Sequence, residues 1–250
     1  MLKTDSKRMW QPFVRAIKEF NLIEKGDRIA IGVSGGKDSL TLVHLLSKLK
    51  KEDRSFDFEI FPIMLNPGTM KKEDTDYIEW LGENVLGQKI HVFHTDIWNI
   101  VFEKRGEKNP CSLCSKMRRG ILYKKAEEFD CNKLALGHHG DDVIETVLIN
   151  MFYGASIKTM LPSVKSTTDK FDLIRPMVYV FEESIINFIS TNELRVIDDN
   201  CEFGSQKYDS KRREIKEMLL DLESKNPIIK KSLLHSVRNV NMNYMWGQSE

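Results

Sequence analysis

The amino-acid sequence predicts an α/β fold, a doubly wound parallel sheet followed by a helical C-terminal extension. Two observations lead to this prediction. Over residues 1–160, short apolar runs rich in β-branched residues alternate with longer segments of helical periodicity. Over residues 161–250 the alternation fades and the remaining segments are mainly helical. Strands separated by helices indicate βαβ units and therefore a parallel sheet.

The predicted elements follow one another in a regular order. The first strand is apolar and ends at a Ser-Gly-Gly turn. Strands are expected at 27–33, 56–65, 89–95, 133–136 and 171–175. Helices are expected at 8–21, 40–49, 73–86, 112–129, 141–153, 181–191, 208–222 and 226–241. Pro12 lies in the early turns of the first helix, and Pro227 marks the start of the last one.

The composition is that of a soluble globular protein. Of the 250 residues 41% are hydrophobic and 30% are charged, and the net charge is +1, which excludes a disordered chain. No apolar run approaches the roughly 20 residues that span a bilayer. The N-terminal residues lack the apolar segment of a secretory signal. We therefore expect a cytoplasmic protein that does not bind membranes.

The run Ser34-Gly35-Gly36-Lys37-Asp38-Ser39 joins the first strand to the first helix after it. Adjacent glycines let the backbone approach an anion, and the N–H groups at a helix N-terminus favour phosphate. The lysine adds a positive charge and the two serines add hydroxyl donors. The run matches neither the Walker A pattern nor the dinucleotide pattern. A simple strand-to-helix turn is the alternative interpretation.

A second loop is expected at the same edge of the sheet. The run Gly137-His138-His139-Gly140-Asp141-Asp142 follows the strand at 133–136 and opens another helix. Either aspartate is suited to cap that helix, and either is suited to hold Mg²⁺. Contact of the histidines with phosphate and a structural role for them are both left open.

The cysteines indicate a metal or redox site. Cys111 and Cys114 form a CxxC pair in the first turn of a predicted helix, where two thiols converge and thiolates are favoured. Cys201 lies in a turn-like stretch far along the chain, and Cys131 is expected in the core. Three thiolates suit a [4Fe–4S] cluster with one open iron, or zinc with one further ligand.

These motifs resemble a known family. The glycine loop resembles the signature of the PP-loop ATP-pyrophosphatases, whose fold is Rossmann-like. The runs CSLCSKMRRGILY (111–123), ALGHHGDD (135–142) and NMFYG (150–154) are similar to the tRNA 2-thiocytidine synthetases, the TtcA family. The similarity covers roughly residues 8–240. The chain lacks the cysteine pairs at both ends that mark the related tRNA 2-thiouridine synthetases, which favours the TtcA family.

The resemblance implies a nucleotide-binding domain at 1–160, with ATP held by Ser34–Ser39 together with Gly137, His138 and Asp142. It implies that the C2 oxygen of a pyrimidine, cytidine 32 of a tRNA, is adenylated and then replaced by sulfur. Lys37, Asp38 and Asp142 are the implied catalytic residues of this step. The two aspartates would position Mg²⁺ or the lysine. A 2-thiouridine synthetase and an amidating or lysidine-forming PP-loop ligase are the alternatives.

The same resemblance assigns the cysteines. Cys111, Cys114 and Cys201 are implied as the ligands of a [4Fe–4S] cluster that delivers the sulfur. Several family members carry a second CxxC before a Gly-Ser-Gln run. Here Phe203 precedes Gly204 and Cys201 stands alone, which favours three ligands.

Basic residues cluster beside these cysteines. Solvated helix faces and RNA contacts both account for such runs. Because the two runs flank proposed cluster ligands, we expect them to bind tRNA. The candidates are Arg118, Arg119, Lys211, Arg212 and Arg213. A sulfur donor such as a cysteine desulfurase is the expected protein partner, and a homodimer is left open.

Overall fold

The computed structural model describes residues 2–53, 55–104, 110–166, 169–197 and 210–244. In these residues six strands form one sheet in the order β3-β2-β1-β4-β6-β5. All neighbouring strands are parallel except β5, which pairs antiparallel with β6 at one edge. The strands are β1 (Arg28–Val33), β2 (Glu59–Asn66), β3 (His91–His94), β4 (Lys133–Ala135), β5 (Ser163–Lys165) and β6 (Asp172–Ile174). The predicted doubly wound parallel sheet is confirmed.

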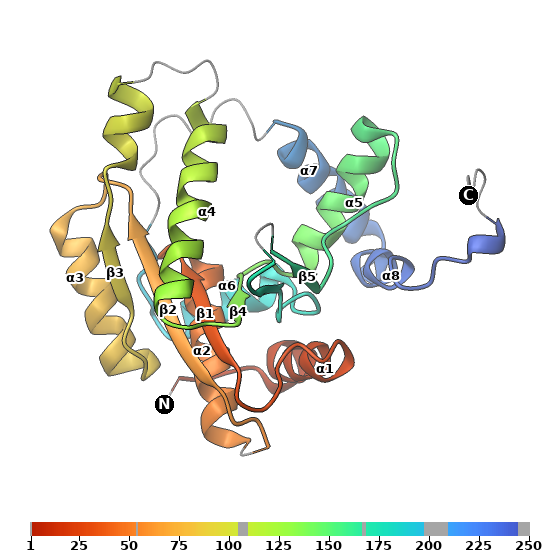
Figure 1. Cartoon of the computed structure of the whole chain (residues 1–250). Helices are drawn as coiled ribbons and strands as arrows, with labels where there is room; N and C mark the ends of the chain where they lie inside the picture. Colours follow the sequence, from red (N-terminus) through yellow and green to blue (C-terminus); the bar gives the residue numbers. More distant parts are fainter. Residues whose placement is uncertain (1, 54, 105–109, 167–168, 198–209, 245–250) are drawn as a thin grey trace.

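The helices connect these strands and extend beyond them (Figure 1). The α-helices are α1 (Gln11–Glu19), α2 (Lys37–Glu52), α3 (Lys72–Leu81), α4 (Pro110–Glu128), α5 (Gly140–Gly154), α6 (Glu182–Thr191), α7 (Ser210–Lys225) and α8 (Ile229–Ser236). Short π-helical turns lie at η1 (Ser6–Trp10), η2 (Gly82–Leu86) and η3 (Asn99–Lys104), and a 3₁₀ turn at η4 (Met242–Tyr244). Each predicted helix is therefore present, although the helix expected at 226–241 is shorter.

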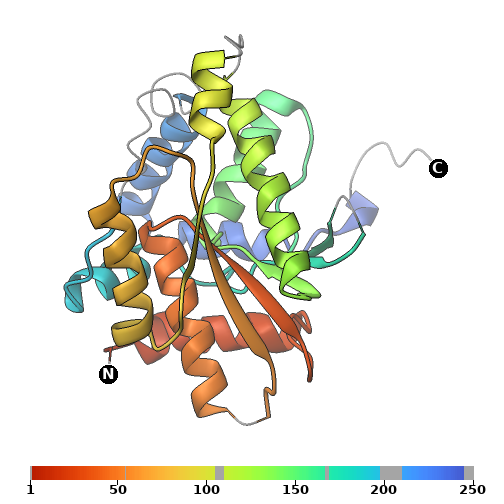
Figure 2. The ribbon, with the colours of Figure 1, turned by 60° about the vertical axis from the view of Figure 1, so that its left-hand side comes forward.

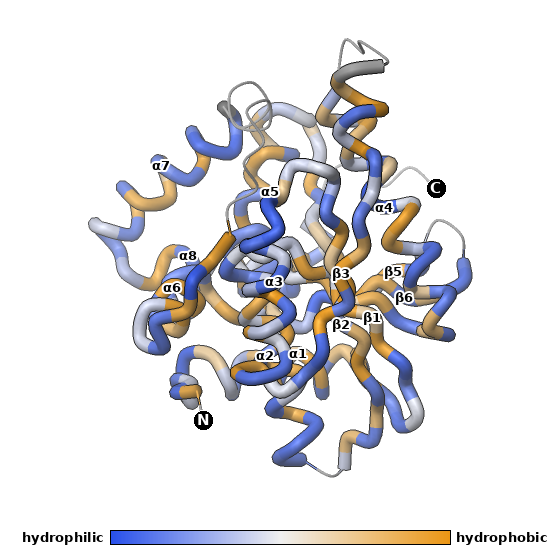
Figure 3. Tube along the Cα trace, turned by 90° about the vertical axis from the view of Figure 1, so that its left-hand side faces the viewer, coloured by the Kyte–Doolittle hydropathy of each residue, from blue (hydrophilic) through white to orange (hydrophobic). Residues whose placement is uncertain are grey.

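Helices cover both faces of the sheet (Figures 1 and 2). On one face α2 packs on β1 and β2, and α6 packs on α2. On the other face α4 lies against β2. Successive residues of a strand point to opposite faces. Accordingly, Ile29 and Ile31 of β1 belong to the core beneath α2, while Ala30 belongs to the core beneath α4. Figure 3 shows the resulting concentration of hydrophobic residues on the central strands.

A separate apolar cluster joins α5, α7 and α8 beside the sheet. Ile144 of α5, Ile215 and Leu219 of α7 and Leu234 of α8 are buried in it. The N–H of Gly140 donates to the carbonyl of Val180 at 2.8 Å, which fixes the start of α5 against the segment before α6. The division of the chain at residue 160 stays a prediction. The strands β5 and β6, which follow residue 160, lie in the same sheet as the earlier strands.

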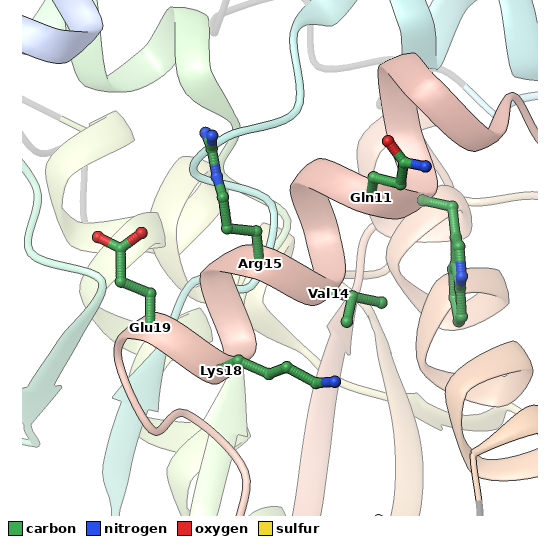
Figure 4. A pocket seen from close by; sticks show the side chains of 6 residues that line it. Gln11, Val14, Arg15, Lys18 and Glu19 are labelled. Carbon is green, nitrogen blue, oxygen red and sulfur yellow. The ribbon is translucent and has the colours of Figure 1, made fainter.

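A surface hollow of about 560 Å³ lies along the outer face of α1. Its lining residues are Trp10, Gln11, Val14, Arg15, Lys18 and Glu19 (Figure 4). This helix is not one of those that carry the candidate site below. As for membranes, every helix in the described residues is too short or too polar to span a bilayer.

Candidate active site

The predicted glycine loop forms the turn between β1 and α2. Gly36 is the N-cap of α2, and Gly35 has a φ of +89°, a conformation that residues with a Cβ rarely adopt. A Cβ at Gly35 would also lie 3.1 Å from the Cβ of Ile197, and the N–H of Ile197 donates to the carbonyl of Gly35 at 3.0 Å. Both the backbone torsion and the packing therefore require glycine at this position.

The two serines of the loop bind to each other and to the loop backbone. The N–H of Ser34 donates to Oγ of Ser39 at 3.2 Å, and Oγ of Ser39 donates to the carbonyl of Gly36 at 3.0 Å. Oγ of Ser34 accepts from the N–H of Gly36 at 3.3 Å. This network fixes the conformation of the loop at the N-terminus of α2, a position where N–H groups and the helix dipole favour an anion.

Lys37 lies between two carboxylates. Its Nζ is 3.0 Å from Oδ2 of Asp38 and 3.1 Å from Oε1 of Glu182. Burial lowers the pKa of Lys37, but the two carboxylates more than offset this effect, so the pKa is raised above its ordinary value. The ammonium group is therefore charged at neutral pH.

Glu182 begins α6 and joins the glycine loop to α7. Besides Lys37 it pairs with Lys216, whose Nζ is 2.7 Å from Oε2 of Glu182. Burial alone would raise the pKa of Glu182, but its hydrogen bonds with Lys216 and Lys37 outweigh burial and lower the pKa to about 2. Sequence reasoning missed this residue, because its role depends on contacts with chain segments far away in sequence.

The second predicted loop lies directly against the first. A Cβ at Gly137 would be 3.2 Å from the carbonyl carbon of Asp38 and 3.2 Å from the nitrogen of Ser39. The N–H of His139 donates to Oδ2 of Asp142 at 2.9 Å, forming a capping box at the start of α5. The structure thus brings both predicted loops together at one edge of the sheet.

Asp141 and Asp142 have different surroundings. Asp141 is 4% exposed; its carboxylate accepts from the N–H of Glu182 at 2.7 Å and lies 3.2 Å from Nζ of Lys230. This carboxylate therefore fixes the junction between α5, α6 and α8. Asp142 caps α5 and lies 3.7 Å from the guanidinium of Arg212.

Three buried polar atoms beside the glycine loop have no hydrogen-bond partner among the described residues: Oδ1 of Asp38, Nδ1 of His138 and Nδ1 of His139. Nε2 of His139 lies 3.6 Å from that Asp38 oxygen. Burial lowers the pKa of His138, with Arg175 acting in the same direction and Asp142 opposing it. A carboxylate oxygen without a partner suits a hard cation such as Mg²⁺, and a neutral imidazole suits a hydrogen bond to phosphate.

Glu145 is a second residue that sequence reasoning missed. It lies one turn after Asp142 on α5, and its carboxylate is 3.1 Å from the guanidinium of Arg212. Burial raises the pKa of Glu145 to about 7, although Arg212 opposes this shift. The pair attaches the first turn of α7 to α5.

The two predicted thiols of the CxxC pair lie in the first turn of α4. Cys111 is half-buried, whereas Cys114 is buried in an apolar cluster with Ile97 and Val101. Cys131 is buried in the core beneath α4, as expected. The third predicted ligand, Cys201, lies outside the described residues. Within the described residues no group of three or more His, Cys, Asp or Glu side chains is placed to hold a metal.

The predicted RNA-binding residues lie on two helices. Arg118 and Arg119 are on α4, the first half-buried and the second exposed. At the start of α7, Arg213 is exposed, Arg212 pairs with the carboxylates of α5, and Nζ of Lys211 lies 4.5 Å from the centre of the Tyr153 ring. Arg212 thus has a structural partner in addition to its predicted contact with RNA.

Known protein families and curated proteins resemble this chain over most of its length. Residues 7–222 match the family model described as PP-loop domain. The tRNA-cytidine(32) 2-sulfurtransferase of Geotalea uraniireducens is 44% identical over 233 residues, covering 92% of this chain and 90% of that protein. The tRNA-cytidine(32) 2-sulfurtransferase of Legionella pneumophila is 37% identical and covers 94% of this chain and 82% of that protein.

Two solved structures share the fold. The U34-tRNA thiolase NcsA from Methanococcus maripaludis with its [4Fe–4S] cluster has a TM-score of 0.70 at 24% identity, covering 96% of this chain and 80% of that one. The NH3-dependent NAD synthetase from Campylobacter jejuni has a TM-score of 0.52 at 14% identity, covering 95% and 93% of the two chains. At these identities the likeness concerns the fold. The family model and the curated relatives show that the chain belongs to the tRNA-cytidine(32) 2-sulfurtransferase family of PP-loop enzymes.

Proposed function

We propose that this chain adenylates the C2 oxygen of a tRNA cytidine with ATP and replaces that oxygen with sulfur. The observation that carries the proposal is the meeting of two loops. The glycine loop at the N-terminus of α2 presents N–H groups and Lys37, and the loop at 137–142 lies against it with Gly137 in backbone contact. The names of the curated relatives support tRNA and cytidine as the substrate.

The residues of the glycine loop would act on ATP. The C2 oxygen of the base bonds to the α-phosphorus while the bond to the bridging oxygen breaks, and pyrophosphate leaves with the electron pair. The loop N–H groups and the Lys37 ammonium would stabilise the charge that develops on pyrophosphate. Asp38 and Asp142 would hold Mg²⁺, since Oδ1 of Asp38 has no hydrogen-bond partner in the described chain.

The cysteines would supply the second half of the reaction. Cys111 and Cys114, one turn apart on α4, together with Cys201 would hold a [4Fe–4S] cluster. When bound, this cluster provides sulfide for the adenylated C2 position, from which AMP leaves. A cysteine desulfurase would supply further sulfur as a persulfide, which a thiol reductant would convert to sulfide while being oxidised to a disulfide. Arg118, Arg119, Arg213 and Lys211 would bind tRNA phosphates around the site.

The test measures pyrophosphate, AMP and thionucleoside by mass spectrometry after anaerobic incubation with ATP, sulfide and unmodified tRNA. Lys37→Ala should lower pyrophosphate release by about 100-fold or more, which is typical for loss of a charge-stabilising group. The control, Lys50→Ala, changes an exposed lysine near the other end of α2 and should behave as wild type. Formation of ADP and phosphate by the wild-type protein would contradict the proposal, and 2-thiouridine in place of 2-thiocytidine would correct the base.

A second pair of variants separates the two halves. Cys111→Ala should retain adenylation but lose both bound iron and thionucleoside. Cys131→Ala removes a buried thiol of the core beneath α4 and should retain iron. Equal iron content in the two variants would refute the ligand assignment while leaving the ATP site unaffected.

A further inference from the structure

The C-terminal end of α5 exposes a cluster of large apolar side chains. Met151, Phe152 and Tyr153 are 45%, 54% and 40% exposed, and Ile157 in the following loop is 57% exposed. The two aromatic rings contact each other edge to face, with their centres 6.5 Å apart. Exposed aromatic pairs are uncommon on surfaces that face only water, because burying such rings is strongly favourable.

A basic side chain contacts this aromatic pair, and other basic residues follow nearby in sequence. Nζ of Lys211 lies 4.5 Å from the centre of the Tyr153 ring, in a cation–π contact. Arg213 on the same turn of α7 and Lys158 after α5 are both exposed. Glu214 accepts a hydrogen bond from the Tyr153 hydroxyl and so fixes the ring. The surface is therefore aromatic and basic at once.

Helix α5 connects this surface to the candidate active site. Its first residues belong to the loop that lies against Asp38, and its 15 residues give it a length of about 22 Å. Figures 1 and 2 show the end of α5, the start of α7 and the start of α4 at the same end of the molecule. An RNA whose reacting base lies at the two loops can therefore extend along α5 to the aromatic pair.

We propose that Phe152 and Tyr153 form a platform on which unpaired bases of the RNA substrate stack, while Lys211 and Arg213 bind the neighbouring phosphates. The inference rests on the proposed tRNA function and names a contact for that substrate. Stacking on exposed aromatic rings beside basic side chains is how proteins bind single-stranded nucleic acid. The cation of Lys211, placed directly against the Tyr153 ring, favours a phosphate-bearing partner over an apolar protein surface.

The test uses the full-length protein and two fluorescent RNAs, a stem-loop with an unpaired loop and a fully paired duplex of the same length. The Phe152→Ala, Tyr153→Ala double variant should bind the stem-loop about tenfold more weakly or worse. Its affinity for the duplex and its salt dependence should match wild type, because no phosphate contact is removed. The double variant Lys211→Ala, Arg213→Ala should instead reduce the slope of log binding constant against log salt concentration by the equivalent of about two phosphate contacts.

Two controls make the result specific. Trp80→Ala removes another exposed ring, 53% exposed and on α3, and should leave stem-loop binding unchanged. Phe152→Tyr with Tyr153→Phe keeps both rings and should also bind as wild type does, which separates stacking from misfolding.

Wild-type stem-loop affinity in the double alanine variant would overturn the proposal. Unchanged RNA binding together with slower sulfur transfer from a protein donor would also overturn it, and would assign the surface to a protein partner. Failure of the wild-type protein to thiolate tRNA concerns the proposed function and is measured separately, as thionucleoside.

Discussion

Replacing Glu182 by glutamine tests whether one carboxylate holds the glycine loop and α7 together. The substitution keeps the size of the side chain but removes its charge. Oε1 of Glu182 faces Lys37 at 3.1 Å and Oε2 faces Lys216 at 2.7 Å. The variant therefore leaves two ammonium groups near each other without the anion between them. We expect a lower free energy of unfolding at neutral pH.

The size of the effect follows from the pKa. The pKa of Glu182 is about 2, against an ordinary value of 4.5, because its hydrogen bonds with Lys216 and Lys37 outweigh burial. At about 1.4 kcal/mol per pKa unit, the whole shift of the Glu182 pKa would correspond to roughly 3 kcal/mol of folding free energy. The side chain of Glu182 is only 15% exposed, but those of its two partners are 30% and 46% exposed. Water therefore screens the pair, and we expect a loss of about 1–2 kcal/mol.

The effect of Glu182→Gln on the free energy of unfolding should depend on pH. Because the folded-state pKa of Glu182 is depressed, its contribution is fully present above pH 4.5 and is lost as the pH falls towards 2. Urea unfolding of wild type and Glu182→Gln should therefore differ by about 1–2 kcal/mol at pH 7, and the difference should shrink as the pH falls from 4.5 towards 2. Glu183→Gln is the control, since that side chain is 74% exposed and lies 3.6 Å from Arg8. Equal stability of wild type and Glu182→Gln at pH 7, or a difference that does not change with pH, would refute the reasoning.

Three further predictions concern neighbouring residues. Gly137→Ala places a Cβ 3.2 Å from the backbone of Asp38 and of Ser39. It should therefore lower the free energy of unfolding in urea by about 1–3 kcal/mol and slow pyrophosphate release. A fully active variant would argue against the close approach of the loops. Burial raises the pKa of Glu145 to about 7, so the free energy of unfolding of the wild type should fall as the pH rises from 5 to 8. Over that range Glu145→Gln should become about 1–2 kcal/mol more stable relative to wild type. A stability difference that stays constant with pH would contradict this. Burial raises the pKa of the Cys131 thiol to about 12, so iodoacetamide at pH 8 should leave it unmodified in the folded protein while modifying it in urea, as peptide mass mapping would show.

Local patterns were sufficient to predict most of the fold. The strand at 28–33 has β-branched residues and a glycine turn at its end, and both are properties of adjacent residues. The strand β5 was missed because it has three residues, all exposed, and therefore no hydrophobic pattern. Antiparallel pairing of β5 with β6 is likewise a non-local property.

The candidate site divides in the same way. The glycine loop and the loop at 137–142 could be predicted to meet, because the carboxyl ends of parallel strands lie at one edge of a sheet. The partners of those loops could not be predicted. Glu182 contacts Lys37 across 145 residues of sequence, and Arg212 contacts Glu145 from another helix. Such ion pairs leave no periodic signal in either segment.

The hydrogen bond from the N–H of Ile197 to the carbonyl of Gly35 ties the glycine loop to a segment far along the chain. Gly35 has a left-handed backbone torsion. Ile197, the residue packed on it, comes after all six strands of the sheet in sequence. A fragment that ended at residue 160 would contain all of Ser34–Ser39 yet lack the segment that fixes its shape. The conformation of this loop therefore depends on more than the short motif, and we expect that transplanting the six residues alone would not reproduce it.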